Sequence, residues 1–193
     1  KDKLYDFTWV DLFCGEGNLI LPILEHISEE DKIDFFKKHI FLFDSQEDMV
    51  KKCIQNAEGF GIPQKIAKKN ILLLDTLEKY PNFIKNLDYP IFHITNPPYL
   101  YIGYIVKTPE AKKHLKYFTG DKKGYQDLYQ IGLINDLEAE VNKLIYIIPS
   151  NFLFGFSVSN KARKKFLKHY SIKKAVIFEK KIFEFTGTNV CIL

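Results

Sequence analysis

The chain has 193 residues, of which 46% are hydrophobic and 27% charged, and its net charge at pH 7 is +4. This length suits one domain of ordinary size, and the apolar fraction excludes intrinsic disorder. Ten Gly and eight Pro residues exclude collagen-like and low-complexity classes. A net charge of +4 is too small to demonstrate a nucleic-acid partner by itself.

The polar chemistry of the chain does not indicate a metal protein or a membrane protein. Cys14, Cys53 and Cys191 form no CxxC pair, and the five histidines show no ligand spacing, so neither a metal site nor a disulfide framework is predicted. A reducing, cytoplasmic location is expected. The uncharged runs at residues 89–106 and 144–160 contain Pro and Asn, which disfavour a membrane span. Both runs are interpreted as buried strands that lead into loops.

Strand-like runs alternate with helical patterns, without an internal repeat or a linker. We expect strands at residues 7–13, 39–43, 71–74, 90–95, 144–148, 175–178 and 189–193. Helical spacing predicts helices at residues 19–27, 49–57, 128–141 and 160–170. A long irregular stretch follows the fourth strand as far as Gly124.

This alternation predicts an α/β fold in one domain spanning residues 1–193. The expected architecture is a Rossmann-like, doubly wound, mostly parallel seven-stranded sheet with helices on both faces. Ligands of such sheets bind beyond the carboxyl ends of the strands. The chain begins at Lys1 without Met and ends in an apolar, strand-like run, so we expect a fragment of a longer protein.

The first predicted strand ends in a turn with two glycines, Asp11-Leu12-Phe13-Cys14-Gly15-Glu16-Gly17. Gly15 and Gly17 allow a sharp turn and the close approach of a ligand. Ile20 stands where a dinucleotide fold has a third small residue, and the chain lacks the Lys-Ser/Thr pair of a P-loop. A plain strand-to-helix turn is the alternative interpretation.

The second and third predicted strands each lead to an acidic residue. Asp44 is placed to accept both hydroxyls of a ribose, but the acids after it fit a helix N-terminus equally well. Asp75 is placed either to accept from an adenine amino group or to cap a helix.

The fourth predicted strand ends in Asn96-Pro97-Pro98-Tyr99, the sharpest feature of the sequence. The two prolines fix the backbone and remove two amide donors, so the carbonyl of Pro97 has no local donor competing for it. Asn96 adds a side-chain acceptor and Tyr99 an aromatic face. Two acceptors beside an aromatic ring suit a planar substrate that bears an NH2 group.

Together these residues resemble the gamma-type S-adenosylmethionine-dependent adenine-N6 methyltransferases of DNA from restriction–modification systems. The Asp-x-Phe-x-Gly-x-Gly run is similar to the first cofactor motif of that family, and Asn-Pro-Pro-Tyr to its catalytic motif. Downstream, residues 126–129 resemble the helix start after the catalytic loop, and residues 147–153 the end of the fifth strand. Residues 182–193 resemble the segment that supplies a second aromatic to the target base.

The resemblance implies a site-specific enzyme that uses S-adenosylmethionine, acts on double-stranded DNA, and works with a restriction endonuclease or a specificity domain or subunit. It implies catalytic roles for Asn96, Pro97, Pro98 and Tyr99, and stacking on the target base by Tyr99 and by Phe183 (or Phe185). A core position is the alternative interpretation of both phenylalanines. It implies cofactor binding by Asp11, Phe13, Gly15, Gly17, Asp44, Asp75 and Asn96. The upstream cofactor motif and the target-recognition domain of the family are missing from the chain, in line with a fragment.

Other functions compete with this interpretation. Methylases of RNA amino groups and of protein glutamines also use an Asn-Pro-Pro-Tyr loop, and a Ser in place of Asn96 would favour cytosine N4. A DNA-binding domain without activity is disfavoured by the intact acceptors of Asn96 and Pro97. A nicotinamide oxidoreductase is disfavoured by Ile20 and does not account for the Pro-Pro pair.

Charge is distributed unevenly along the chain. Residues 1–98 carry 12 basic and 16 acidic side chains, whereas residues 99–193 carry 16 and 8. The half expected to meet a phosphate backbone is therefore the basic half. For the irregular stretch we favour DNA contact or a lid over the target base, and for the basic helix at 160–170 a solvated face slightly over DNA contact. The lysines of that stretch are Lys107, Lys112, Lys113, Lys116, Lys122 and Lys123.

Overall fold

The computed structural model describes residues 2–180, 182 and 189–193. The chain forms two compact units, the first made of Lys1–Thr95 with Val141–Ile145 and the second of Asn96–Glu140 with Tyr146–Leu193. The strands are β1 (Thr8–Asp11), β2 (Ile40–Asp44), β3 (Ile71–Leu73), β4 (Ile91–Thr95), β5 (Lys143–Pro149), β6 (Val176–Ile177) and β7 (Val190–Ile192).

Among the described residues these strands follow the order β3-β2-β1-β4-β5-β7-β6. β1 pairs in parallel with β2 and β4, and β2 with β3, whereas β7 is antiparallel to β5 and β6. The mostly parallel, seven-stranded sheet expected from the sequence is confirmed. The α-helices are α1 (Lys32–His39), α2 (Glu47–Gly59), α3 (Gln64–Asn70), α4 (Ile102–Lys107), α5 (Leu128–Glu138), α6 (Asn151–Phe154) and α7 (Asn160–His169).

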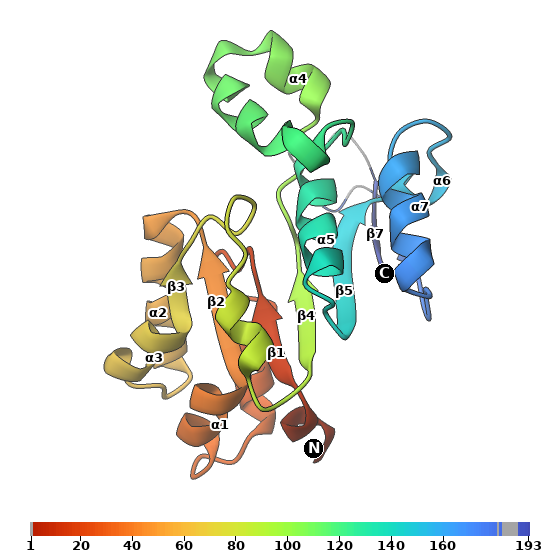
Figure 1. Ribbon diagram of the computed structural model, residues 1–193. Helices are drawn as coiled ribbons and strands as arrows, with labels where there is room; N and C mark the ends of the chain where they lie inside the picture. Colours follow the sequence, from red (N-terminus) through yellow and green to blue (C-terminus); the bar gives the residue numbers. More distant parts are fainter. Residues whose placement is uncertain (1, 181, 183–188) are drawn as a thin grey trace. The chain divides into compact units, whose positions relative to one another are not determined.

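In the first unit both faces of the sheet are covered, as Figure 1 shows for β2 and its neighbours. Successive side chains of a strand point to opposite faces. Ile40 and Leu42 of β2 therefore join the core formed with α1, α2 and α3, whereas Phe41 and Phe43 contact Phe83, with ring centroids 6.0 Å apart. Phe83 belongs to the 3-10 helix η3 (Asn82–Asn86). Burial on both sides explains why these strands are apolar at nearly every position.

The second unit is organised by α5, which is buried along most of its length. Tyr129 of α5 makes an edge-to-face contact with Phe152 of α6, which in turn contacts Phe166 of α7. Tyr146 of β5 donates a hydrogen bond to the fully buried Asp136 of α5. These contacts join α5, β5, α6 and α7 into one core.

The helix expected at residues 19–27 is present as the 3-10 helix η2 (Leu21–His26), with i→i+3 bonds such as Ile23 N–H to Ile20 O; Pro22 removes a donor there. One of the predicted elements was wrong. The stretch up to Gly124 is not irregular, because it contains α4 and the 3-10 helices η4 (Pro109–Phe118) and η5 (Gly120–Lys122). The helices α1, α3 and α6 and the 3-10 helices η1 (Asp2–Asp6) and η3 were not predicted.

Among the described residues, no helix has the length and hydropathy needed to cross a membrane. The three cysteines are buried and free. The described part of the chain contains no group of three or more His, Cys, Asp or Glu residues that could hold a metal ion.

Candidate active site

The glycine turn after β1 is fixed by the acidic residue at the end of β2. One carboxylate oxygen of Asp44 accepts the N–H of Gly15 at 2.9 Å, and the other accepts the N–H of Gln46 at 2.9 Å. The N–H of Cys14 donates to the carbonyl of Phe43 at 2.8 Å. Asp44 therefore organises both the glycine turn and the start of α2, in line with the helix N-terminus interpretation, and its binding of a ribose stays a prediction.

The two glycines of the turn have different roles. Both have positive φ, +52° at Gly15 and +86° at Gly17. No atom lies within 4 Å of the position that a Cβ on Gly15 would take, whereas a Cβ on Gly17 would lie 2.6 Å from Leu21 Cδ1 and 2.8 Å from Cys53 Sγ. Gly15 thus faces open space that a ligand can enter, and Gly17 is required by internal packing.

Asp11 is a buried organiser of the turn. Its side chain is 1% exposed, and Oδ1 accepts the N–H of Phe13 at 2.9 Å and the hydroxyl of Thr95 at 2.6 Å. Burial raises the pKa of Asp11 to about 6, against the lowering effects of His93 and of these hydrogen bonds. His93 Nε2 lies 3.1 Å from the N–H of Leu12, which donates to it. With so little exposure, the Asp11 carboxylate serves to hold the turn.

The end of β3 lies at the same edge of the sheet. The hydroxyl of Thr76 donates to Leu12 O at 2.7 Å, and the N–H of Leu74 donates to Asp44 O at 2.8 Å. These bonds place the half-buried Asp75 beside the turn. The predicted cofactor residues of the first unit are therefore brought together. Sequence reasoning missed Thr76, His93 and Thr95, whose buried hydrogen bonds have no signature in a single sequence.

In the second unit the Asn-Pro-Pro-Tyr loop is held by its tyrosine. Tyr99 Oη lies 2.5 Å from Asn96 Oδ1 and 2.6 Å from Ile147 O of β5. Burial raises the pKa of Tyr99, so this hydroxyl stays protonated. Within the described part of the chain, the carbonyl of Pro97 accepts no hydrogen bond. This agrees with the sequence argument that the two prolines remove the nearby amide donors.

The exit of this loop is fixed to the start of α5. Asp127 Oδ1 accepts the N–H of Leu100 at 2.8 Å, and the N–H of Ile102 donates to Gln126 O at 2.8 Å. Burial raises the pKa of Asp127 to about 6. α5 begins directly after Asp127, so the helix start predicted at this motif is confirmed. Phe183, the predicted second stacking residue, lies outside the described residues.

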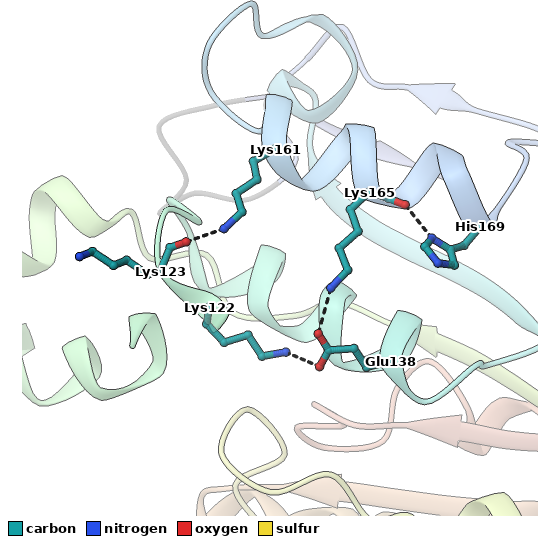
Figure 2. Close-up of polar contacts among 6 residues, drawn as sticks. All are labelled: Lys122, Lys123, Glu138, Lys161, Lys165 and His169. Atoms are coloured by element: carbon teal, nitrogen blue, oxygen red, sulfur yellow. Dashed lines mark hydrogen bonds and ion pairs between the residues drawn. The ribbon is translucent and has the colours of Figure 1, made fainter. Parts of the chain in front are cut away.

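Several lysines of the second unit are engaged internally (Figure 2). Glu138 of α5 pairs with Lys122 at 2.8 Å and with Lys165 of α7 at 3.0 Å. Burial raises the pKa of Glu138, but the two lysine contacts outweigh burial and bring this pKa below its ordinary value. Lys161 Nζ donates to Lys123 O at 2.5 Å and lies 4.2 Å from the ring centroid of Tyr125. These contacts fasten η5 to α5 and α7.

Three other lysines of the second unit lie exposed on α4 and η4. Lys107, Lys112 and Lys113, here named the α4–η4 lysines, form no ion pair within the described part of the chain. Tyr101 and Tyr104, next to them in sequence, are 48% and 55% exposed. On α7, Arg163 donates to Phe152 O at 2.6 Å and Gly155 O at 2.8 Å. Lys161, Arg163 and Lys165 of α7 therefore make internal contacts, whereas Lys164 and Lys168 are exposed.

The sheet, with a glycine turn after β1 and an Asn-Pro-Pro-Tyr loop after β4, has the Rossmann-like architecture of class I methyltransferases. Residues 9–183 match one family, and the chain belongs to it: the Eco57I restriction-modification methylases. No curated protein matches the chain.

Solved structures share this fold at low sequence identity. A nuclease-deletion mutant of the type ISP restriction-modification enzyme LlaGI, in complex with a DNA substrate mimic, is 19% identical with a TM-score of 0.68, over 97% of this chain and 20% of that chain. The M protein of the type I restriction enzyme EcoKI is 12% identical with a TM-score of 0.60, and the match covers 96% of this chain and 38% of that protein. A methyltransferase subunit of a type I restriction-modification system from Streptococcus thermophilus is 18% identical with a TM-score of 0.58, and the match covers 97% of this chain and 39% of that protein. The chain thus spans between a fifth and two fifths of these proteins.

Proposed function

We propose that this chain is the catalytic domain of a restriction–modification methyltransferase that transfers a methyl group from S-adenosylmethionine to N6 of adenine in double-stranded DNA. The Asn-Pro-Pro-Tyr loop is the main observation behind the proposal, because it offers two acceptors beside an aromatic ring. Membership of the restriction-modification methylase family supports it. The DNA substrate mimic bound by the LlaGI enzyme supports DNA as the substrate.

The first unit fits an adenosyl cofactor. Each carboxylate oxygen of Asp44 accepts one backbone N–H and has a second lone pair left for a ribose hydroxyl. The open space at Gly15 lets a ligand approach the backbone. We assign Asp44, Asp75, Phe13 and the glycine turn to cofactor binding, with Asp11 and Gly17 in supporting positions. When bound, S-adenosylmethionine supplies a methyl group already activated by its sulfonium.

The catalytic loop has to improve a weak nucleophile, since the lone pair of the adenine amino nitrogen is delocalised into the ring. If Asn96 Oδ1 and Pro97 O each accept one amino hydrogen, they draw the nitrogen toward tetrahedral geometry and direct its lone pair. Such bonds contribute about 0.5–1.5 kcal/mol each in ordinary settings, and more in a dry, preorganised site. The free carbonyl of Pro97 fits this role.

Adenine N6 is not accessible inside a duplex, so the base has to leave the stack at a cost of a few kcal/mol. Stacking on an aromatic ring contributes roughly 1–3 kcal/mol per base, which is of the same size. Tyr99 supplies one such ring in the proposal and Phe183 the other. The exposed α4–η4 lysines are assigned to the DNA phosphates, and a specificity domain or subunit, or a restriction endonuclease, is the expected partner.

The test is to incubate the protein with methyl-labelled S-adenosylmethionine and mixed duplex DNA, digest the DNA to nucleosides, and identify the labelled nucleoside. Label in N6-methyladenine is expected. Label in N4-methylcytosine, or in RNA or glutamine when these are offered instead, would replace adenine with one of the competing acceptors.

A variant separates the catalytic loop from the cofactor site. Asn96→Ala is expected to abolish transfer, because it removes one of the two acceptors, while the affinity for S-adenosylmethionine falls little. Calorimetry gives the affinity and the labelled assay gives the transfer. Near-normal turnover in Asn96→Ala would rule out the proposed activation of the amino group.

A further inference from the structure

The hydroxyl of Tyr99 stands between two acceptors but has only one proton. Asn96 Oδ1 lies at 2.5 Å and Ile147 O at 2.6 Å. A backbone carbonyl cannot donate, so the bond to Ile147 O requires the tyrosine proton. With the amide of Asn96 oriented this way, its oxygen would face the hydroxyl oxygen without a proton between them.

Rotating the amide of Asn96 by half a turn removes this conflict, and the O and N ends of an amide are assigned from the bonds they make. Asn96 Nδ2 then donates to Tyr99 Oη, and Tyr99 Oη donates to Ile147 O. The amide oxygen of Asn96 is directed away from the tyrosine and left without a partner in this group of three.

The carbonyl of Ile147, the third group in this set of hydrogen bonds, is fixed by strand β5. Tyr146 of β5 exchanges both backbone hydrogen bonds with Leu193, the residue that follows β7. Carbonyls alternate in direction along a strand, so the carbonyl of Ile147 is directed away from β7 and is open to the hydroxyl of Tyr99. The acceptor position is therefore set by backbone geometry.

We propose that the hydroxyl of Tyr99 is a positioning group, which holds the amide of Asn96 with its oxygen toward the substrate amino group through the relay Asn96 Nδ2–H to Tyr99 Oη–H to Ile147 O. The inference rests on the proposed function and adds to it a role for an atom that stacking does not use. Stacking needs only the ring, whereas the relay needs the hydroxyl.

Tyr99→Phe tests the relay because it keeps the ring and removes the hydroxyl. Methyl transfer in a single turnover is expected to slow about tenfold, the effect of one hydrogen bond lost in the transition state, while the affinities for S-adenosylmethionine and DNA stay within about twofold. In an Asn96→Asp background the same change should have little effect, because a carboxylate presents an oxygen on both sides. An equal loss in both backgrounds, or no loss in either, would overturn the proposal.

A second readout does not depend on activity. The NMR signals of the Asn96 side-chain amide can be assigned in a 15N-labelled sample, because they are absent from Asn96→Asp. One of these protons should be hydrogen-bonded, and in Tyr99→Phe it should shift upfield and exchange faster with solvent. Tyr129→Phe is the matched control, since Tyr129 contacts the Tyr99 ring but bonds Ser159 at 2.6 Å. It should leave the Asn96 signals unchanged. If the wild type transfers no methyl group to DNA, the proposed function fails, and the amide spectra still decide the relay: signals unaltered by Tyr99→Phe would refute it.

Discussion

The two glycines of the turn after β1 should respond in opposite ways to the same substitution. In Gly17→Ala the new methyl group would lie 2.6 Å from Leu21 Cδ1 and 2.8 Å from Cys53 Sγ. Overpacking of this kind costs about 1–3 kcal/mol, and a positive φ costs about 1–2 kcal/mol for an L-residue. The smaller entropy of the unfolded chain offsets about 0.4–1 kcal/mol. The expected loss in the free energy of unfolding is therefore about 3 kcal/mol.

Gly15→Ala has the positive φ without the collision, because nothing lies within 4 Å of its Cβ. Its stability should fall by about 1 kcal/mol or less once the unfolded-state term is included, while the methyl group occupies the space assigned to the cofactor. Urea unfolding measures the first property, and calorimetric titration with S-adenosylmethionine the second. Equal destabilisation by the two substitutions would refute the packing role of Gly17. Wild-type affinity in Gly15→Ala would refute the close approach of the cofactor at that position.

Three further changes test the electrostatics. The pKa of Asp11 is raised from 3.8 to about 6 in the folded protein, so the stability it contributes is present below pH 4 and lost as the pH rises through 6. Lowering the pH from 7 to 4.5 should therefore stabilise the wild type relative to Asp11→Asn by about 2 kcal/mol, as measured by urea unfolding. If the difference in unfolding free energy between the two proteins did not change with pH, the raised pKa of Asp11 would be contradicted. Arg163→Ala should lower stability by about 2 kcal/mol, because the carbonyls of Phe152 in α6 and of Gly155 after it lose a charged donor, and should speed chymotrypsin cleavage after the exposed Phe154 and Phe156. Lys164→Ala is the control, and equal cleavage rates in the two variants would show that Arg163 does not hold α6 in place. Replacing the α4–η4 lysines with Ala should reduce the slope of log affinity for DNA against log salt by about 2–3, whereas an unchanged slope would place the phosphates elsewhere.

The strand ends could be predicted from the sequence because each strand is a buried apolar run followed by a polar or glycine turn. β2, β4 and β5 begin or end within one residue of the prediction. The short helices could not, since α1 and α3 have only eight and seven residues and give little periodicity. The stretch after residue 96 lacked a helical pattern because 3-10 turns repeat every three residues.

The predicted site residues fall into their motifs, but the sequence did not distinguish their tasks. Gly15 and Gly17 look alike in a motif, and only the positions of Leu21 and Cys53 separate them. The basic residues posed the same problem. Lys161 and Lys165 are engaged by groups 38 and 27 positions away in sequence, so their internal use emerges only from tertiary structure.

The hydrogen bond between Asp11 and Thr95 has an evolutionary consequence. One carboxylate oxygen serves both the N–H at the start of the glycine turn and the hydroxyl directly before Asn96. Because the Asp11 carboxylate and the Thr95 hydroxyl are buried, replacing either residue alone leaves the other without this partner, at a cost of about 1–3 kcal/mol, so replacing both should cost less than the sum of the two single changes. The two positions should therefore be epistatic, so that homologues of this chain change them together or keep both, although 84 residues separate them.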